Sequence, residues 1–281
     1  MREPGCSTWC FFDRSLTGAI EELSSRTNTI EIFADAAHDI LCRKPLPVPD
    51  EGIFLSVHAP TADINLASCR ETVRNASVEI IAGVCQKAAE MGASHVVVHP
   101  GFCPWREQEK ESFSALLRSL DDLVRIQEQT GMTVAVENMG SWEMCHFRDP
   151  GLLPELSGRG LSFCLDVGHA FLNGVLDDFL SRGSPCAVHI HDNRGRNDDH
   201  LPPGMGNIDF TRVFWQLSRE IPWILEIADR ADVDRGLLTL ANLGTSDGQG
   251  KSDIADDPCH PDIHRRRGED VSLPLRMYKQ K

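Results

Sequence analysis

The sequence predicts an α/β protein of the (β/α)8 barrel type, and three observations carry this prediction. Apolar runs of strand length recur eight times along the chain, and each is followed by a helical pattern. Most of these runs end in or beside a histidine or a carboxylate. The chain has 281 residues, of which 41% are hydrophobic, which is enough for the core of one large domain. We therefore expect a single closed barrel.

The eight strands are expected from short apolar runs rich in Val, Ile and Phe. In chain order they are residues 6–11, 29–33, 53–58, 94–99, 133–137, 161–166, the run from 186 to 188, and residues 222–227. The seventh run is predicted to end where His189 begins a loop that reaches Phe210. That loop holds three His and four Asp beside a Gly-x-Gly turn at Gly204 and Gly206. A solvated surface loop has no need for so many potential metal ligands.

Helices are expected wherever apolar residues recur every three or four positions. The first has Leu16, Ile20 and Leu23 on one face, and a short helix is expected near residues 36–41, before a proline-rich link at 45–49. Two long helices are expected to end at Gly92 and Gly131, because glycine commonly caps helix C-termini. A last helix is expected near residues 232–243.

An open, doubly wound sheet is the structural alternative to the barrel. Such a sheet binds its ligands at one switch point between strands. It would not need metal-competent residues at the ends of six different strands, so the closed barrel is favoured.

Composition limits the class of protein and its partners. The start of the chain has no apolar signal region and no stretch has the length of a membrane span, so a cytoplasmic protein without membrane contact is expected. The ten cysteines are scattered and lack a Cys-x-x-Cys motif, so reduced thiols are expected. The net charge of −14 disfavours extended contact with nucleic acid.

The barrel domain is predicted to span residues 1–243. Residues 244–281 lack apolar periodicity and are predicted to be a disordered tail. Cys259, His260 and His264 lie in this tail, where no strand or helix is expected to fix them as metal ligands.

Nine residues at or after the predicted strand ends form the candidate metal site. One histidine at a strand end is ordinarily a structural residue, but nine imidazoles and carboxylates at one barrel mouth indicate a metal site. Buried carboxylates repel one another unless a cation compensates their charge. We therefore expect a divalent metal, Zn²⁺, Mn²⁺ or Mg²⁺, bound by residues from the set His58, His99, Glu137, Asp166, His169, His189, Asp198, His200 and Glu226.

The ordered series of motifs resembles the xylose isomerase-like TIM-barrel superfamily over about residues 6–243. This superfamily contains sugar isomerases and epimerases as well as the endonuclease IV family of abasic-site repair enzymes. The motifs that carry the resemblance are Val57-His58-Ala59-Pro60, Val98-His99-Pro100-Gly101, Val136-Glu137-Asn138, Leu165-Asp166-Val167-Gly168-His169, residues 189–195, Asp198-Asp199-His200 and Ile224-Leu225-Glu226.

The isomerase and epimerase branch implies one divalent metal held by Glu137, Asp166, His189 and Glu226. The metal polarises the carbonyl and hydroxyl of a sugar and stabilises an enediolate. Glu137 and Glu226 are the catalytic residues in this interpretation, because one takes a proton from carbon and the other returns it.

The endonuclease IV branch implies three zinc ions held by all nine residues. By resemblance, His58 and His99 hold the first ion and Asp166, His189 and Glu226 the second, with Glu137 bridging the two. A third ion lies with His169, Asp198 and His200, and such a cluster activates a hydroxide and clamps a phosphodiester. All nine residue types are present here, which keeps this activity as the alternative.

The substrate is expected to be a sugar or a sugar phosphate contacted by Asn138, His191, Arg194 and Arg196. A DNA enzyme needs basic and intercalating side chains on the mouth loops. The candidates for that role are few, namely Arg43, Lys44, Trp105, Arg106, Arg194 and Arg196. A metal-dependent isomerase or epimerase is therefore favoured over an abasic-site endonuclease, and both over a non-catalytic barrel, which would be expected to have lost ligands.

Overall fold

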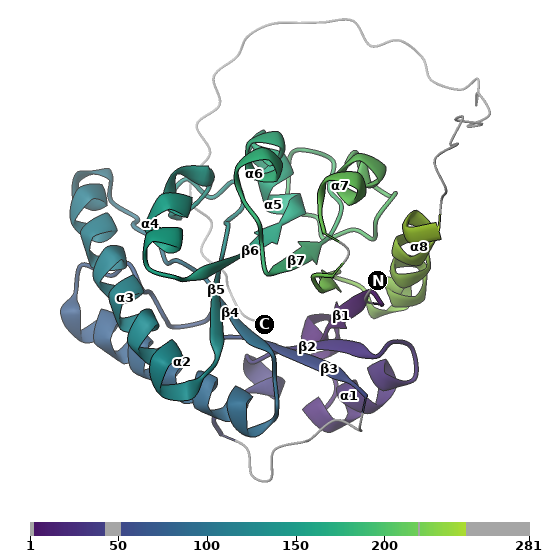
Figure 1. Ribbon diagram of the computed structural model, residues 1–281, viewed down its shortest axis with the longest axis horizontal. Coiled ribbons are helices and arrows are strands. Elements are labelled where there is room, and N and C mark those ends of the chain that lie inside the picture. Colours follow the sequence, from purple (N-terminus) through teal and green to yellow (C-terminus); the bar gives the residue numbers. More distant parts are fainter. Residues whose placement is uncertain (1–2, 43–51, 219, 246–281) are drawn as a thin grey trace, which may run out of the picture. The chain divides into compact units, whose positions relative to one another are not determined.

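Eight parallel strands close into a barrel in the computed structural model, which describes residues 3–42, 52–218 and 220–245. Each strand pairs in parallel with the next along the chain, and β8 pairs with β1 to complete the ring. The strands lie at the centre of Figure 1 and the helices surround them. The strands are β1 Gly5–Ser7, β2 Thr29–Phe33, β3 Phe54–His58, β4 His95–Val98, β5 Thr133–Glu137, β6 Ser162–Asp166, β7 Ala187–Ile190 and β8 Trp223–Leu225.

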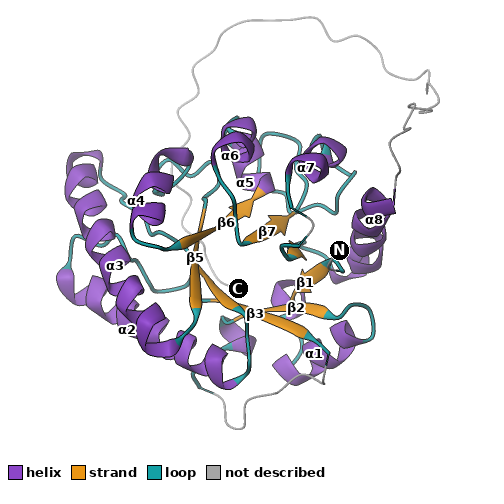
Figure 2. Ribbon diagram, viewed as in Figure 1, coloured by secondary structure: helices purple, strands orange, loops and turns teal. Residues whose placement is uncertain are grey.

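The helices form the outer layer around the strands (Figure 2). The α-helices are α1 Leu16–Ser24, α2 Glu71–Glu90, α3 Glu109–Thr130, α4 Leu153–Gly158, α5 Val167–Leu172, α6 Leu176–Arg182, α7 Phe210–Gln216 and α8 Val233–Thr245. Short 3-10 helices lie at η1 Thr8–Phe11, η2 Ala36–His38, η3 Arg106–Gln108, η4 Pro150–Leu152 and η5 Arg230–Asp232. None of the helices in the described part of the chain is long and apolar enough to cross a membrane.

Two hydrophobic clusters stabilise the barrel from its two sides. Side chains alternate between the faces of a strand, so every second residue points into the barrel. The larger cluster packs the outward faces of the strands against the helices. The smaller one lies on the inward faces of neighbouring strands and consists of Val97, Ala135, Cys164 and Ala187. These small inward residues leave room for polar side chains closer to the mouth.

The predicted barrel is confirmed, and the second and fifth strands have the predicted bounds. The helix predicted to stop at Gly131 does so, with Gly131 in the left-handed conformation at φ 71°. The short helix expected near residues 36–41 is a single 3-10 turn at 36–38.

Three strand predictions are wrong at their carboxyl ends. The eighth strand, predicted over residues 222–227, ends at Leu225, so Glu226 follows the strand. The predicted first strand, residues 6–11, is a strand only to Ser7, whose hydroxyl accepts a hydrogen bond from the Trp9 amide and turns the chain into η1. The seventh strand runs on to Ile190, so His189 lies inside β7 instead of opening a loop. The proline-rich link, the pair Arg43 and Lys44, and residues 246–281, which include Cys259, His260 and His264, lie outside the described residues.

Candidate metal centre

Five of the candidate ligands lie on four strands or directly after one, at the carboxyl end of the barrel. His58, Glu137 and Asp166 are the last residues of β3, β5 and β6, while His189 lies in β7 and Glu226 follows β8. All five are at most 4% exposed. Because the carboxyl ends of parallel barrel strands meet at one mouth, residues far apart in sequence become neighbours.

Glu137 lies at the centre of this set. Its Oε2 lies 2.9 Å from His58 Nε2 and 3.3 Å from His99 Nε2. Its Oε1 lies 3.3 Å from Nδ1 of His189 and 3.5 Å from Nδ1 of His169. Burial disfavours the charged carboxylate, but the surrounding imidazoles outweigh it and hold the pKa of Glu137 well below its usual range.

Donor atoms from all nine candidate ligands lie in four groups, three of which share members. Within each group the nitrogen and oxygen atoms lie within 4.8 Å of one another. Each group mixes imidazole and carboxylate, the donors that zinc and manganese accept. The groups in the described part of the chain are His58 with His99 and Glu137; His58 with His189 and Glu226; Glu137 with Asp166, His189 and Glu226; and His169 with His191, Asp198 and His200.

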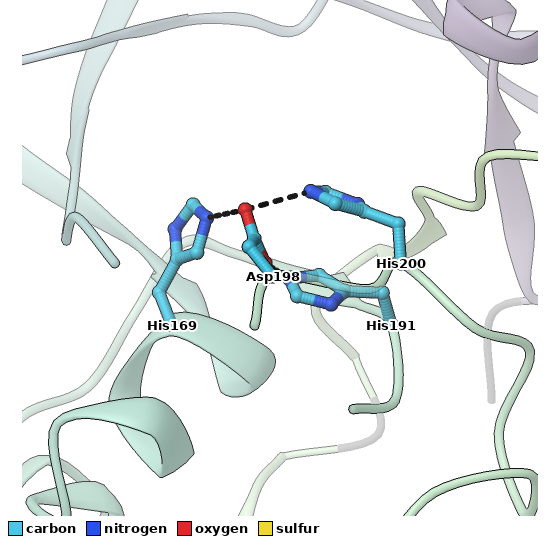
Figure 3. Close-up of side chains that lie close together, drawn as sticks. All are labelled: His169, His191, Asp198 and His200. Carbon is cyan, nitrogen blue, oxygen red and sulfur yellow. Dashed lines mark hydrogen bonds and ion pairs between the residues drawn. The ribbon is translucent and has the colours of Figure 1, made fainter. Parts of the chain in front are cut away.

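The fourth group surrounds Asp198, as Figure 3 shows. Asp198 Oδ2 lies 3.3 Å from His169 Nε2 and 3.1 Å from His200 Nε2, and its Oδ1 lies 3.5 Å from His191 Nε2. The rings of His191 and His200 stack with centroids 3.9 Å apart. Burial opposes the ionised Asp198, but His169 and His200 lower its pKa. Burial likewise opposes charging of His169, yet Asp166 and Asp198 raise its pKa to about 10.

Three of the histidines are oriented in the same way by backbone carbonyl groups. Nδ1 of His58, His169 and His200 lies 2.7, 2.9 and 2.8 Å from the carbonyl oxygens of Ala59, Asn138 and Glu226. A ring nitrogen facing a carbonyl oxygen must donate, so each Nε2 faces the site. Such bonds to the far nitrogen are typical of histidines that ligate metals.

His200 is also held in a strained backbone conformation. Its φ is 45°, in the left-handed region that residues with a side chain rarely adopt. Its carbonyl accepts a hydrogen bond from the Ala228 amide at 3.0 Å, which ties the loop to the chain after β8. Backbone strain of this kind is retained where the position of a side chain matters.

Several buried donor atoms have no hydrogen-bond partner of good geometry within the described residues. Those that face the centre include Oδ2 of Asp166, Oδ1 of Asp198, Oε1 of Glu226, Nδ1 of His189 and Nε2 of His191. Buried polar atoms in proteins are nearly always partnered, because an unsatisfied one costs free energy. A divalent cation would satisfy these atoms, so the residues fit a metal ion by both donor type and placement.

Asp192 organises the loop that carries Asp198 and His200. Its buried carboxylate accepts hydrogen bonds from the backbone amides of Gly204, Gly206 and Ile208 at 3.0, 2.7 and 3.2 Å. Its own backbone pairs with Leu201 as an antiparallel bridge. The loop therefore folds back on the end of β7 instead of extending into solvent.

The expected substrate-binding residues fall into two classes. Asn138 and His191 are fully buried. Asn138 donates from Nδ2 to the Asp166 carbonyl at 2.9 Å and accepts from the Asp166 amide at 2.8 Å, which ties β5 to β6. Arg194 and Arg196 are exposed on the loop after β7. Substrate contact by these four residues stays a prediction.

Glu31, Trp9 and Trp142 were not predicted from the sequence, and His191 was predicted as a substrate contact only. His191 was not among the expected ligands, although its spacing of two from His189 on a strand indicates the same face. Glu31 lies against His189. The sequence feature that could have identified it is its position as one charged residue in the middle of an apolar strand. The rings of Trp9 and Trp142 pack against His200 and His169, with centroids 4.6 and 5.7 Å apart.

Comparisons with known proteins agree with the barrel fold. A family described as xylose isomerase-like TIM barrel matches residues 48–243. An uncharacterized protein of Methanocaldococcus jannaschii, MJ1614, is 35% identical over 211 residues, which cover 73% of this chain and 84% of that protein. A probable endonuclease 4 of Mycobacterium ulcerans is 35% identical over 168 residues, covering 54% of this chain and 64% of that protein. The crystal structure of a D-tagatose 3-epimerase-like protein superposes with a TM-score of 0.74 at 27% identity, covering 86% of this chain and 96% of the other.

Proposed function

Because the chain belongs to the xylose isomerase-like TIM-barrel family, we propose that it is a metal-dependent isomerase or epimerase of a sugar or sugar phosphate. In this proposal Glu137, Asp166, His189 and Glu226 hold one divalent ion, Zn²⁺ or Mn²⁺. The observation that carries it is the pair of buried carboxylates around His189. Nδ1 of His189 lies 3.3 Å from Glu137 Oε1 and 3.7 Å from Glu226 Oε1.

When bound, the ion would polarise the carbonyl and the neighbouring hydroxyl of the sugar. Glu137 and Glu226 move the proton. One carboxylate takes the proton from the carbon beside the carbonyl, and the electron pair of the broken C–H bond enters an enediolate. The other carboxylate delivers a proton to the opposite face of that carbon, which inverts it, or to the neighbouring carbon, which moves the carbonyl. The low pKa of Glu137 keeps its carboxylate ionised at neutral pH.

The surroundings of the centre suit a small polar substrate. The half-buried Trp9 and the exposed Trp142 stand beside the histidines of the fourth group, where they offer flat apolar surfaces to a sugar ring. Arg194 and Arg196 are exposed on the loop after β7, and a guanidinium group there suits a single phosphate. The two arginines extend the proposal from sugars to sugar phosphates.

A zinc-dependent abasic-site endonuclease is the second candidate, and specific observations favour it. The group of His58, His99 and Glu137 and the group around Asp198 provide donors for two further ions beside the first. The relative from Mycobacterium ulcerans is named a probable endonuclease 4. In this candidate function Asp198 and His200 hold an ion next to the scissile phosphodiester, so their loss would be as damaging as that of Glu137.

The test assays purified protein on ketoses, aldoses and their phosphates, in parallel with a duplex that contains one abasic site. Glu137→Gln and Glu226→Gln should each lower sugar turnover by about 10²- to 10⁴-fold, the usual contribution of a proton-transfer group. Asp198→Asn should lower it less. Glu128→Gln, an exposed position on α3, serves as the matched control and should leave turnover unchanged.

Cleavage at the abasic site would overturn the isomerase proposal if it depended on added metal, was abolished by Asp198→Asn and came with no proton exchange into any sugar. The same result would establish the endonuclease candidate.

A further inference from the structure

A carboxylate that no step of the proposed reaction uses lies on the inner face of the barrel, below the metal centre. Glu31, in the middle of β2, is fully buried. Its Oε2 accepts a hydrogen bond from the Ser56 hydroxyl at 2.9 Å and lies 4.0 Å from Nε2 of His95. Its Oε1 lies 2.9 Å from Nε2 of His189. Three polar groups from three other strands therefore surround one buried charge.

The contact between Glu31 and His189 crosses the interior of the barrel. Glu31 is on β2 and His189 on β7, and β1 and β8 lie between these strands in the ring. Register between neighbouring strands therefore cannot account for the contact. The inward residues at this level include Val97, Ala135 and Cys164, so an apolar side chain at position 31 would match its surroundings. Burying a carboxylate among them is unfavourable unless a specific partner compensates it.

His189 is oriented in the opposite way from the other histidines of the centre. His58, His169 and His200 turn Nδ1 to a backbone carbonyl and Nε2 to the site. His189 turns Nδ1 to the site, 3.3 Å from Glu137 Oε1, and Nε2 to Glu31. The partner of its far nitrogen is thus a charged side chain, where the other three have a neutral carbonyl.

We propose that Glu31 is a positioning residue for His189. The carboxylate keeps the proton of the ring on Nε2, leaves the lone pair of Nδ1 directed at the site, and raises the basicity of that nitrogen as a metal ligand. The inference rests on the proposed function in one respect, since it takes His189 as a ligand of the ion. Ser56 holds the far oxygen of the carboxylate and thereby fixes its direction.

The first test needs only the wild-type protein, loaded with zinc and labelled with ¹⁵N-histidine. The expected NMR spectrum shows the His189 ring with its proton on Nε2 and with Nδ1 bound to the metal. A ring of His189 that carries its proton on Nδ1 in the zinc-loaded protein would overturn the proposal. Wild-type protein that binds no zinc would instead refute the proposed function.

The second test measures zinc affinity by competition with a chelator. Glu31→Leu keeps the volume of the side chain and removes the acceptor, and should weaken zinc binding about 10- to 100-fold, as losses of such outer partners do. Glu31→Gln keeps an acceptor without its charge and should weaken binding less than Glu31→Leu. Val134→Ala, a fully buried truncation on the outward face of β5, is the matched control for lost stability and should leave the affinity unchanged.

A zinc affinity of Glu31→Leu within threefold of wild type would overturn the assignment, as would an equal loss in Val134→Ala. If Glu31→Leu does not fold, Glu31→Gln decides: its affinity should fall while the His189 proton stays on Nε2. An unchanged affinity of Glu31→Gln would then count against the proposal.

Discussion

Gly168 leaves the space that His191 occupies, and replacing it with alanine tests the group around Asp198. Gly168 lies in the first turn of α5. A Cβ added there would lie 2.1 Å from Cε1 of His191 and 2.4 Å from both ring nitrogens. Ordinary van der Waals contact begins at 3.4 Å, so the ring must move by about 1.3 Å. Ligand distances in a metal site tolerate about 0.2 Å, so Gly168→Ala should remove His191 as a donor.

The assay is a zinc titration of metal-free protein, followed by metal analysis after desalting. If the group around Asp198 holds an ion, as in the second candidate function, wild-type protein should take up an ion that Gly168→Ala protein does not retain. The crowding should in either case cost about 1–3 kcal/mol of unfolding free energy. Gly158→Ala, in helix α4, is the control because an added Cβ there meets nothing within 4 Å. Equal zinc content and affinity in Gly168→Ala and wild type would refute the assignment of His191 to this group.

Two further predictions follow from the loop and from the charges of the centre. Asp192→Asn puts an amide group among amides that now donate to a carboxylate, so unfolding free energy should fall by about 1–3 kcal/mol; an unchanged melting temperature would contradict this. The pKa of His169 is about 10 against an ordinary 6.5, so its stabilising charge is complete below pH 6.5 and lost as the pH rises towards 10. The melting temperature of the metal-free protein should therefore fall between pH 6.5 and 10, and it should fall less in His169→Gln. A melting temperature of the wild type that does not change with pH would count against a charged His169.

The strand positions were predictable because the barrel buries its strands on both faces. Residues 29–33 and 133–137 are continuous runs rich in β-branched side chains, and both became strands with the expected bounds. The ends of β1 and β7 were less predictable, because local bonds decide them. A serine hydroxyl ends β1, and pairing of Ile190 with Leu225 on β8 extends β7 beyond its first histidine.

The candidate ligands could also be predicted from the strand ends, because a parallel barrel brings the carboxyl ends of all its strands together. Hydrophobic periodicity could not predict the contacts that cross the barrel. Glu31 and His189 are 158 positions apart in sequence on strands that do not pair, so their contact depends on the diameter of the closed ring. The fourth group was incomplete for a similar reason, because the fold of the loop around Asp192 turns Asp198 towards His191.

The ligand set alone does not separate sugar chemistry from phosphodiester cleavage, because the same donors serve both. The rim of the mouth carries more information. Within the described residues, Arg106 at the start of η3 pairs with Glu143 at 2.9 Å, and Arg230 at the start of η5 pairs with Asp13 at 2.8 Å. A duplex needs several cationic groups free to contact phosphates, and these two arginines face carboxylates, which leaves Arg194 and Arg196 as the exposed arginines of the loop after β7. The chain also carries a net charge of −14, which repels a polyanion over a longer range. An uncharged sugar that enters the mouth faces neither obstacle, and a sugar phosphate brings only one phosphate group; for this reason the proton-transfer reaction is favoured over DNA cleavage.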